Sequence, residues 1–345
     1  MSPRGPALLL GALLGCEASP KGLLGGERGL DHVGVAVRDL RAAQDSFQRR
    51  LGFERPIPGH LPNGLDNVNF YFEDATYLEA LTPYDPAKAD WLAWFLAHHG
   101  EGGNFVVLSA RSASDTAAFL RQRGFATAPP TEGSIQIEGG RPGGRWRTLF
   151  FDRSPLPGSP LYFIEYPKGP RAEFLRQLED PAIVRRSFYH RNTAVGLRAV
   201  WLAVADLDEA VRRYAAIGLP PGRPWESAAL HARGQVLFAG RGALLLLSPS
   251  GPGPVQDFLA RRGPGVLGFS IAVRELKTAQ QVVAKGLALP PARPAASDLY
   301  AGAFGNSFLV SDVHGAYVEF TEAATRLGLR DFIAPAPQSA AGAGR

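Results

Sequence analysis

The chain repeats one pattern four times, and this repetition limits its fold more than any other feature. Each copy starts with alternating apolar residues, continues with a polar or acidic residue, and then shows a helical pattern that ends near a glycine. The copies begin with HVGVAVRDL at 32–40, NFVVLSARSAS at 104–114, AVWLAVADL at 199–207 and GFSIAVREL at 268–276. Because one such unit cannot bury its apolar face alone, the repeat predicts that the copies pack against one another.

Two or three strand-like runs follow the helical pattern in each copy. They include NVNFYFEDATYLEAL at 67–81, RTLFFDRSPLPGSPLYFIEY at 147–166, GQVLFAGRGALLLLSP at 234–249 and GNSFLVSDVHGAYVEF at 305–320. Alternating apolar runs separated by polar turns are typical of a curved sheet with one face in the core. The sequence therefore predicts an α+β fold with four βαβββ modules in two tandem pairs that form cupped mixed sheets.

Two amphipathic segments indicate that the halves of the chain are related. Residues 90–105 and 255–269 share the letters FLA, followed two residues later by glycine, and each precedes the second module of a pair. We expect a first module pair at 30–167, a linker helix region at 168–194 and a second pair at 195–333. Residues 334–345 have the composition of a disordered tail.

The N-terminus carries the only cysteine, Cys16, directly after the apolar stretch ALLLGALL at 7–14. A charged start, a short apolar run and small residues form a secretory signal that is too short to span a bilayer as a mature helix. LLGC at 13–16 resembles the lipobox of bacterial lipoprotein signals, which implies cleavage after residue 15 and lipidation of Cys16. Residues 16–29 are then a flexible tether. In enteric-type sorting, Glu17 after the cysteine implies a lipid anchor in the outer membrane, facing the periplasm.

The net charge of +5 is modest for 345 residues, and the arginines are spread along the chain. This distribution indicates a solvated basic surface and no nucleic-acid partner.

The strands LDHVGVAVRDL, YLEAL and DVHGAYVEF resemble the vicinal oxygen chelate superfamily, which includes glyoxalase I, extradiol dioxygenases and antibiotic-resistance binding proteins. The resemblance covers about residues 30–325. GRPGGRWRTLFFDRSPLPGSPLYFIEY at 140–166 is more narrowly similar to the glyoxalase-like branch. A fold resemblance does not establish a reaction.

The resemblance also implies a set of metal ligands, taken from the first and last strands of each module. In the first half these positions are His32, Glu79 and Glu165, with the fourth at Asn104 or Phe105 depending on the alignment. One imidazole and two carboxylates suit Zn, Mn, Fe or Ni with open positions for a substrate. Glu79 and Glu165 are then also candidates for moving a proton.

In the second half the corresponding positions are Ala199, Leu245, Gly268 and Glu319, so that half is expected to be structural or to form a different pocket. His60 and Asn69, near a glycine- and proline-rich loop, and Arg147, beside Trp146, are candidate substrate-binding residues. Five aromatic residues are further candidates to line the cup, although alternation implies that about half of them face the core: Phe70, Tyr71, Phe72, Phe151 and Phe163.

Two classes of function remain open from the sequence. One is an envelope-anchored, metal-dependent lyase or isomerase that acts on a small oxygenated substrate, since the missing second histidine disfavours a dioxygenase. The other is a non-catalytic lipoprotein of the same fold that binds a small molecule.

Overall fold

The computed structural model describes residues 24, 29–137, 141–158, 160–166, 188–288 and 301–323. The predicted signal peptide, Cys16, the tail at 334–345, and most of the tether and of the linker region lie outside the described residues. Within these described ranges, no helix is long and apolar enough to cross a membrane.

The first half consists of two βαβββ modules joined by one helix. The first module comprises β1 (Gly29–Ala36), α1 (Leu40–Asp45) with its π-helical extension η1 (Ser46–Arg50), β2 (Ile57–Leu61), β3 (Leu65–Tyr71) and β4 (Tyr77–Pro83). After α2 (Asp90–His99), the second module comprises β5 (Gly102–Ser109), α3 (Ala113–Gln122), β6 (Thr131–Ile137), β7 (Arg141–Leu149) and β8 (Leu161–Glu165).

The second half repeats this order. Its first module comprises β9 (Ala194–Ala203), α6 (Leu207–Ala216), β10 (Pro221–Ser227), β11 (Ala232–Ala239) and β12 (Gly242–Pro249). After α7 (Pro254–Arg262) follow β13 (Gly265–Val273), α8 (Leu276–Gly286), β14 (Ala301–Gly302), β15 (Gly305–Val313) and β16 (Ala316–Glu322). This order confirms the predicted fold class.

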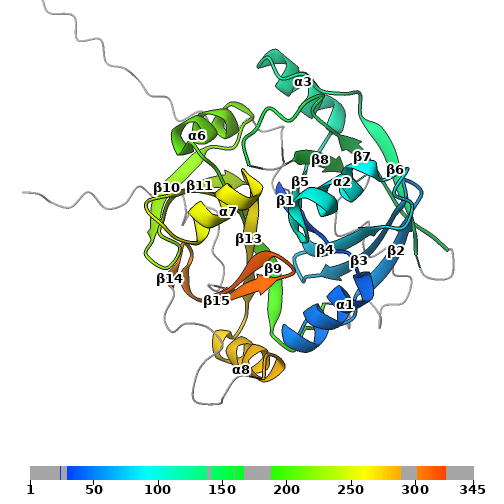
Figure 1. Cartoon of the computed structure of the whole chain (residues 1–345). Coiled ribbons are helices and arrows are strands. Elements are labelled where there is room, and N and C mark those ends of the chain that lie inside the picture. The colour runs from blue at the N-terminus through cyan, green and yellow to red at the C-terminus, as the bar shows by residue number, and fades with distance from the viewer. Residues whose placement is uncertain are drawn as a thin grey trace, which may run out of the picture.

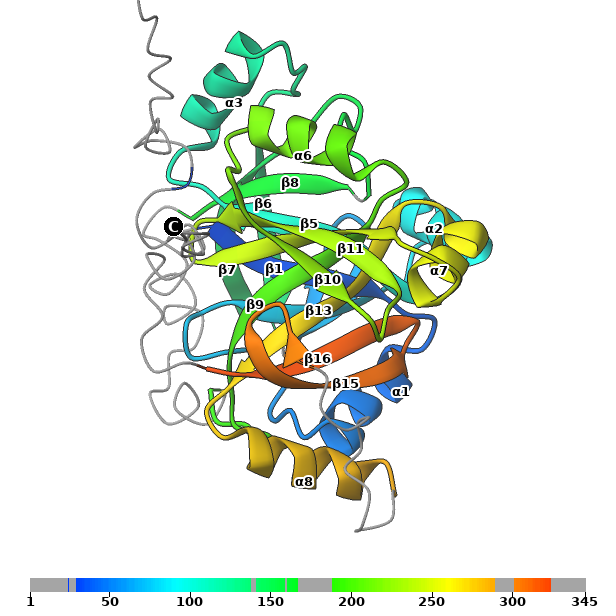
Figure 2. The ribbon, with the colours of Figure 1, turned by 90° about the vertical axis from the view of Figure 1, so that its left-hand side faces the viewer.

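The two halves form two curled sheets that lie side by side (Figures 1 and 2). The first is a closed barrel with the strand order β1-β4-β3-β2-β6-β7-β8-β5. The second is an eight-stranded sheet with the order β10-β11-β12-β9-β13-β16-β15-β14. In both, the first strand of the half pairs parallel to the last strand of its own module and antiparallel to the first strand of the next module.

The polar residue before each of three helices is an N-cap. The side chains of Asp39, Ser112 and Asp206 accept hydrogen bonds from the backbone N–H three residues later. Such caps satisfy one of the free donors at a helix start. Gly52 and Gly218 follow their helices with φ of 80° and 90°, a left-handed conformation that glycine adopts without strain.

The largest core lies between the two sheets and is built from both halves. β1 packs on β9, and β5 packs on β13. Val33, Val106, Val200 and Phe269 from these four strands belong to one buried cluster. The convex faces of the two sheets therefore share a core, and their concave faces do not take part in it.

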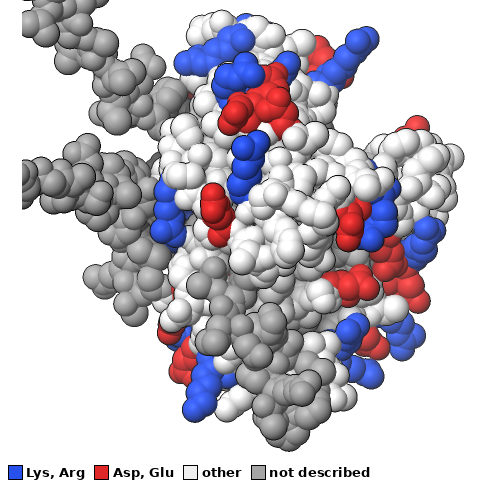
Figure 3. Space-filling view, turned by 60° about the vertical axis from the view of Figure 1, so that its left-hand side comes forward, with Lys and Arg blue, Asp and Glu red and all other residues white. Residues whose placement is uncertain are grey.

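Charge is distributed over the surface of the described residues. On the face shown in Figure 3, lysine and arginine side chains are interspersed with aspartate and glutamate. The positive net charge is not gathered into one patch on this face.

His190 joins the start of the second half to the first half. It is buried, its Nδ1 accepts a hydrogen bond of 2.9 Å from the Glu54 backbone N–H, and its Nε2 donates to the Tyr71 carbonyl at 2.8 Å. Burial lowers the pKa of His190 to about 4, because the charged ring cannot be hydrated there.

From the lowered pKa of His190 we predict that the protein loses stability in mild acid. The unfolded chain takes up a proton near pH 6.5, whereas the folded ring stays neutral until about pH 4, so stability falls as pH drops through that window. Between pH 7.5 and 5 we expect a loss of about 2 kcal/mol from this residue, measured by urea unfolding. His190→Gln should remove this component of the pH dependence, and His98→Gln on the exposed face of α2 should not. Equal pH dependence in the parent and in His190→Gln would contradict the assignment.

Candidate functional site

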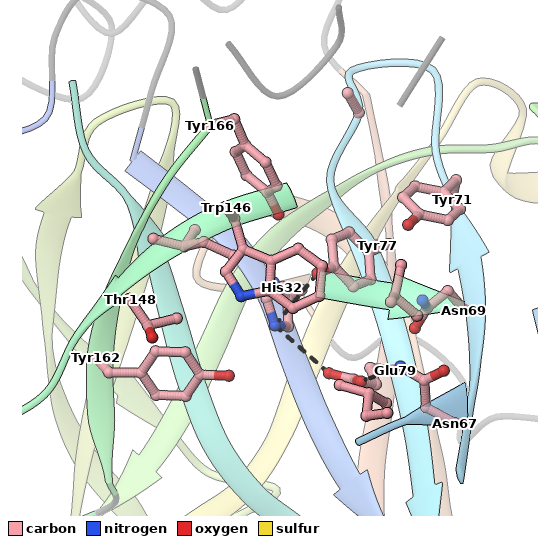
Figure 4. Close-up of a pocket in the computed structure, with 14 residues that line it drawn as sticks. His32, Asn67, Asn69, Tyr71, Tyr77, Glu79, Trp146, Thr148, Tyr162 and Tyr166 are labelled. Atoms are coloured by element: carbon pink, nitrogen blue, oxygen red, sulfur yellow. Dashed lines mark hydrogen bonds and ion pairs between the residues drawn. The ribbon is translucent and has the colours of Figure 1, made fainter. Parts of the chain in front are cut away.

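The inside of the first barrel contains a pocket of about 80 Å³, which we call the barrel pocket (Figure 4). Such a volume holds several water molecules or one small organic molecule. Because successive side chains of a strand point to opposite faces, alternate residues of the barrel strands reach the pocket. The lining residues are His32, Leu61, Asn67, Asn69, Tyr71, Ala75, Tyr77, Glu79, Ile135, Trp146, Thr148, Tyr162, Ile164 and Tyr166.

His32 is the central polar group of the pocket. Its Nδ1 donates to Asp31 Oδ1 at 2.7 Å, and its Nε2 lies 3.5 Å from Glu79 Oε2. The ring stacks on Tyr77 with centroids 4.1 Å apart, and the Tyr77 hydroxyl lies 3.4 Å from Nε2. Two carboxylates and one aromatic ring therefore fix the orientation of the imidazole.

Asp31 lies behind His32, at the seam between the two halves. Its side chain is fully buried and also accepts a hydrogen bond of 3.2 Å from the Tyr166 hydroxyl. The facing cation is Arg241, from the turn between β11 and β12, whose Nη2 is 3.7 Å from Asp31 Oδ2. Arg241 is held there by the carbonyls of Leu30 and Asp74, at 3.1 and 2.6 Å. The second half thus supplies the countercharge for a carboxylate of the first.

Glu79 is oriented by its neighbours on β3. Asn67 Nδ2 donates to Glu79 Oε1 at 2.5 Å, and Asn69 is the direct register partner of Glu79. All three side chains line the pocket and are at least nine-tenths buried. Asn69 therefore lies in the wall of the barrel pocket, where the sequence analysis expected it near the cup.

Three tyrosine hydroxyls of the pocket keep their protons. The pKa values of Tyr77, Tyr162 and Tyr166 are raised well above the ordinary value, mainly by burial. The negative charge of Asp31 raises all three further. The Tyr77 and Tyr162 hydroxyls are therefore available to donate hydrogen bonds to a ligand, whereas the Tyr166 hydroxyl already donates to Asp31.

Glu165 and Arg147 lie on the outer face of the barrel, and the structure does not bring them together with His32 and Glu79. Glu165 Oε2 accepts a hydrogen bond of 2.8 Å from the Ala113 backbone N–H at the start of α3. Arg147 lies 3.5 Å from Glu165 and 3.3 Å from Glu132. The inward residues of these two strands are Trp146, Thr148, Tyr162 and Ile164.

Phe105, not Asn104, shares the inner face with His32. Their ring centroids are 6.0 Å apart, and Phe105 is the register partner of Gly34, where the missing side chain leaves room for its ring. Asn104 has the alternation of Val106, which faces the core between the sheets. Asn104 is buried but does not line the pocket.

His60 lies outside the pocket as well. Its ring stacks on Tyr84, and its Nδ1 donates to Asp66 at 2.6 Å on the exposed surface. Of the aromatic residues considered for the cup, Tyr71 lines the pocket. The others pack in or against the core between the sheets: Phe70, Phe72, Phe151 and Phe163.

The residues that the structure brings together do not match the metal site that the resemblance implied. Only His32 and Glu79 of the four expected ligands face one another, and the inward neighbours of the other two are Phe105 and Ile164, which carry no ligand atom. No group of three or more His, Cys, Asp or Glu side chains in the described ranges is spaced to hold a metal ion. The donor set therefore does not fit the expected site of one imidazole and two carboxylates for Zn, Mn, Fe or Ni.

The concave face of the second sheet is filled by side chains. Ala199 and Leu245 belong to a buried apolar cluster with Trp201. Glu319 is buried and accepts a hydrogen bond from Ser270, whose hydroxyl in turn accepts from Trp201 Nε1. Burial raises the pKa of Glu319 in spite of hydrogen bonds from Ser270 and Ser307.

Several residues of the pocket were missed in the sequence. Asp31, which directly precedes His32, was not among the predicted site residues. The signal available for the rest was alternation: Tyr77 with Glu79, Asn67 with Asn69, Trp146 with Thr148, and Tyr162 with Ile164. Alternation shows which residues of a strand share a face, but it does not show which face lies inside the barrel.

The sequence profile of the glyoxalase-like domain family matches residues 30–218, more than half of the chain. The protein belongs to this glyoxalase-like family. No curated protein matches the sequence.

Solved structures with the same fold come from several bacteria. A variant of 4-hydroxymandelate synthase from Streptomyces coelicolor has a TM-score of 0.60 and 14% identity, over 86% of this chain and 92% of that one. A hypothetical protein from Staphylococcus aureus has a TM-score of 0.57 and 11% identity, over 85% and 99%. The Mn(II)-bound glyoxalase from Novosphingobium aromaticivorans has a TM-score of 0.51 and 13% identity, over 85% and 81%. At these identities the likeness shows the fold alone.

From the contact between Asp31 and Arg241 we predict that removal of the Arg241 guanidinium strongly lowers the stability of the protein. In Arg241→Met the buried carboxylate of Asp31 has no facing cation, so we expect a loss of about 3 kcal/mol or more in the free energy of unfolding. Asp31→Asn combined with Arg241→Met should recover part of that loss, because the charge left unpaired is removed too. Urea unfolding of the four proteins of this cycle gives the coupling. Strictly additive losses would contradict a direct interaction.

Proposed function

We propose that the barrel pocket binds a small molecule and that His32 and Glu79 transfer a proton to or from it. The observation that carries this proposal is the distance of 3.5 Å between His32 Nε2 and Glu79 Oε2 inside a buried cavity. A proton-transfer enzyme needs a base and an acid within reach of one bound atom.

Asp31 prepares His32 for this role. A carboxylate can only accept, so the bond of 2.7 Å places the ring hydrogen on Nδ1. When the ring is neutral, the lone pair of Nε2 then points into the pocket, where a substrate can be reached. The same bond stabilises the imidazolium that forms when Nε2 takes a proton, as in other carboxylate–histidine pairs.

Glu79 complements His32 as the second proton carrier. Its Oε2 lies 3.5 Å from His32 Nε2, within reach of the same bound molecule. Binding of a substrate beside the pair lets one partner remove a proton and the other return it. Tyr77 and Tyr162, which stay protonated, are available to donate hydrogen bonds to an oxygen that gains negative charge.

A second candidate is a binding protein without catalysis. The observation that favours it is the number of aromatic rings around the pocket, since Tyr71, Tyr77, Trp146, Tyr162 and Tyr166 suit retention of a ligand. Catalysis remains the first candidate, because a glyoxalase and a synthase are among the solved structures with this fold.

We also propose that the protein is anchored in the bacterial cell envelope by lipid on Cys16. The support is the sequence LLGC after a short apolar run. Several acyl chains on one N-terminus hold a protein stably at a membrane, whereas one chain does not.

The proton-transfer proposal predicts hydrogen exchange into a bound substrate. A panel of small carbonyl compounds with an acidic C–H bond is incubated with the protein in D₂O and followed by NMR. The parent should exchange the C–H of at least one compound. His32→Asn and Glu79→Gln should each lower that rate by about 100-fold or more.

Arg147→Gln, on the outer face of the barrel, is the matched control and should exchange at the parental rate. Exchange that persists in both pocket variants would contradict the proposal. Compounds that bind in the pocket without exchange, equally in the parent and in His32→Asn, would leave the binding protein as the function.

The anchor predicts that Cys16→Ser changes the location of the protein. In a bacterial host grown with labelled palmitate, the parent should carry label and sediment with membranes, because its N-terminus is acylated. Cys16→Ser should carry none, and an inhibitor of the lipoprotein signal peptidase should leave a longer precursor. An unlabelled, fully released parent would contradict the anchor.

A further inference from the structure

The charges of the barrel pocket distinguish between kinds of ligand. None of its lining residues is lysine or arginine, and one of them, Glu79, is a carboxylate. Two arginines on or behind the barrel are engaged elsewhere, Arg147 with Glu132 and Glu165 outside the barrel, and Arg241 behind Asp31. His32 is already held between two carboxylates. Among the described residues, no free cation faces Glu79, so an anionic ligand would be buried against this carboxylate at a high cost in free energy.

Two buried side-chain oxygens on β3 have unused hydrogen-bonding capacity. Oδ1 of Asn67 and Oδ1 of Asn69 are buried, and neither has a hydrogen-bond partner in the structure. The orientation of Asn67 is fixed, because its Nδ2 has to face the Glu79 carboxylate. Buried acceptors without donors are rare in folded proteins and indicate that a donor arrives from outside.

These acceptors lie together around Glu79. Asn69 is opposite Glu79 in the ladder, and Asn67 contacts the Glu79 carboxylate directly. Figure 4 shows both amides and the carboxylate on one side of the cavity, below Tyr71. A primary ammonium group has three hydrogens to donate and one positive charge, which matches two amide oxygens and one carboxylate.

Aromatic rings occupy other parts of the wall. Tyr71 and Tyr77 pack with centroids 4.7 Å apart, and Trp146 and Tyr162 approach from the second module (Figure 4). Ring faces attract cations and also cover the carbon skeleton of a ligand. The charges of Asp31 and Glu79 oppose ionisation of Tyr77 and Tyr162, in addition to burial, and the same negative field favours a cation in the pocket.

We infer that the ligand of the barrel pocket is a small primary amine, bound as its ammonium ion. Its ammonium group lies against Glu79, Asn67 and Asn69, and its carbon skeleton lies against the tyrosine and tryptophan rings. The inference rests on the proposed function in that it concerns the same pocket, but it does not require that a proton is transferred.

A set of compounds of equal shape tests the inference. Isobutylamine, isobutanol and isobutyrate have the same branched skeleton and carry a positive, neutral or negative group. Their dissociation constants for the full-length protein are measured by NMR titration at pH 7.5. We expect isobutylamine to bind at least tenfold more tightly than isobutanol, and isobutyrate to show no binding in the same range. Tetramethylammonium, a cation without N–H donors, should bind at least threefold more weakly than isobutylamine.

Variants locate the binding to the acceptors. Asn69→Leu, which keeps the branching and the number of side-chain heavy atoms but removes the acceptor, and Glu79→Gln should each weaken isobutylamine binding at least fivefold and leave isobutanol binding unchanged within twofold. Circular dichroism confirms that both variants are folded. Arg147→Gln is the control outside the barrel and should bind isobutylamine as the parent does.

His32→Asn separates this inference from the proposed function. If it abolishes hydrogen exchange but binds isobutylamine within threefold of the parent, both proposals stand. If the parent binds isobutylamine as described and exchanges no substrate, the proposed proton transfer fails and the amine site stands. If isobutanol or isobutyrate binds as tightly as isobutylamine, or the amine binds equally to Asn69→Leu and Glu79→Gln, the amine site is overturned.

Discussion

Both faces of the strands in the first barrel are buried, and this constraint decides which of their side chains enter the core and which enter the pocket. The outward faces of β1 and β5 pack into the core that the two halves share, through residues such as Val33 and Val106. The inward faces enclose the barrel pocket, through His32 on β1 and Glu79 on β4. Since side chains alternate along a strand, a shift of one residue exchanges core for pocket. The candidate site therefore depends on the registers of the whole barrel and not on one motif.

The two halves share a module order but use their concave faces differently. The barrel encloses the barrel pocket, whereas Trp201, Leu245 and Glu319 of the second sheet are buried. The second half still contributes to the site, because its β11–β12 turn carries Arg241 to the back of Asp31. A buried carboxylate without a cation would be unstable there. Asp31, and through it His32, are therefore positioned by a residue about 210 positions away in the sequence.

The polar groups of the pocket give Glu79 two roles that are compatible. Its Oε2 faces His32 Nε2 across 3.5 Å, as the proposed proton transfer requires. With the proposed amine bound, the ammonium hydrogens take over the neutralisation of its charge. The chain thus differs from a metal-centred site, in which the ion would balance the carboxylates and polarise the substrate.

The sequence by itself determined the four modules and their order, because repetition and alternation are properties of local order, and its family resemblance pointed to His32 and Glu79. It placed Glu165 and Arg147 at the site and left Asn104 or Phe105 open, because alternation does not say which face of a strand is inside. The tertiary structure decided that question: closure of the barrel turned Trp146, Tyr162 and Phe105 inward and left Glu165 to bind the start of α3. It also decided the partner of Asp31, since the contact with Arg241 joins residues of different halves that only the packing of the two sheets brings together.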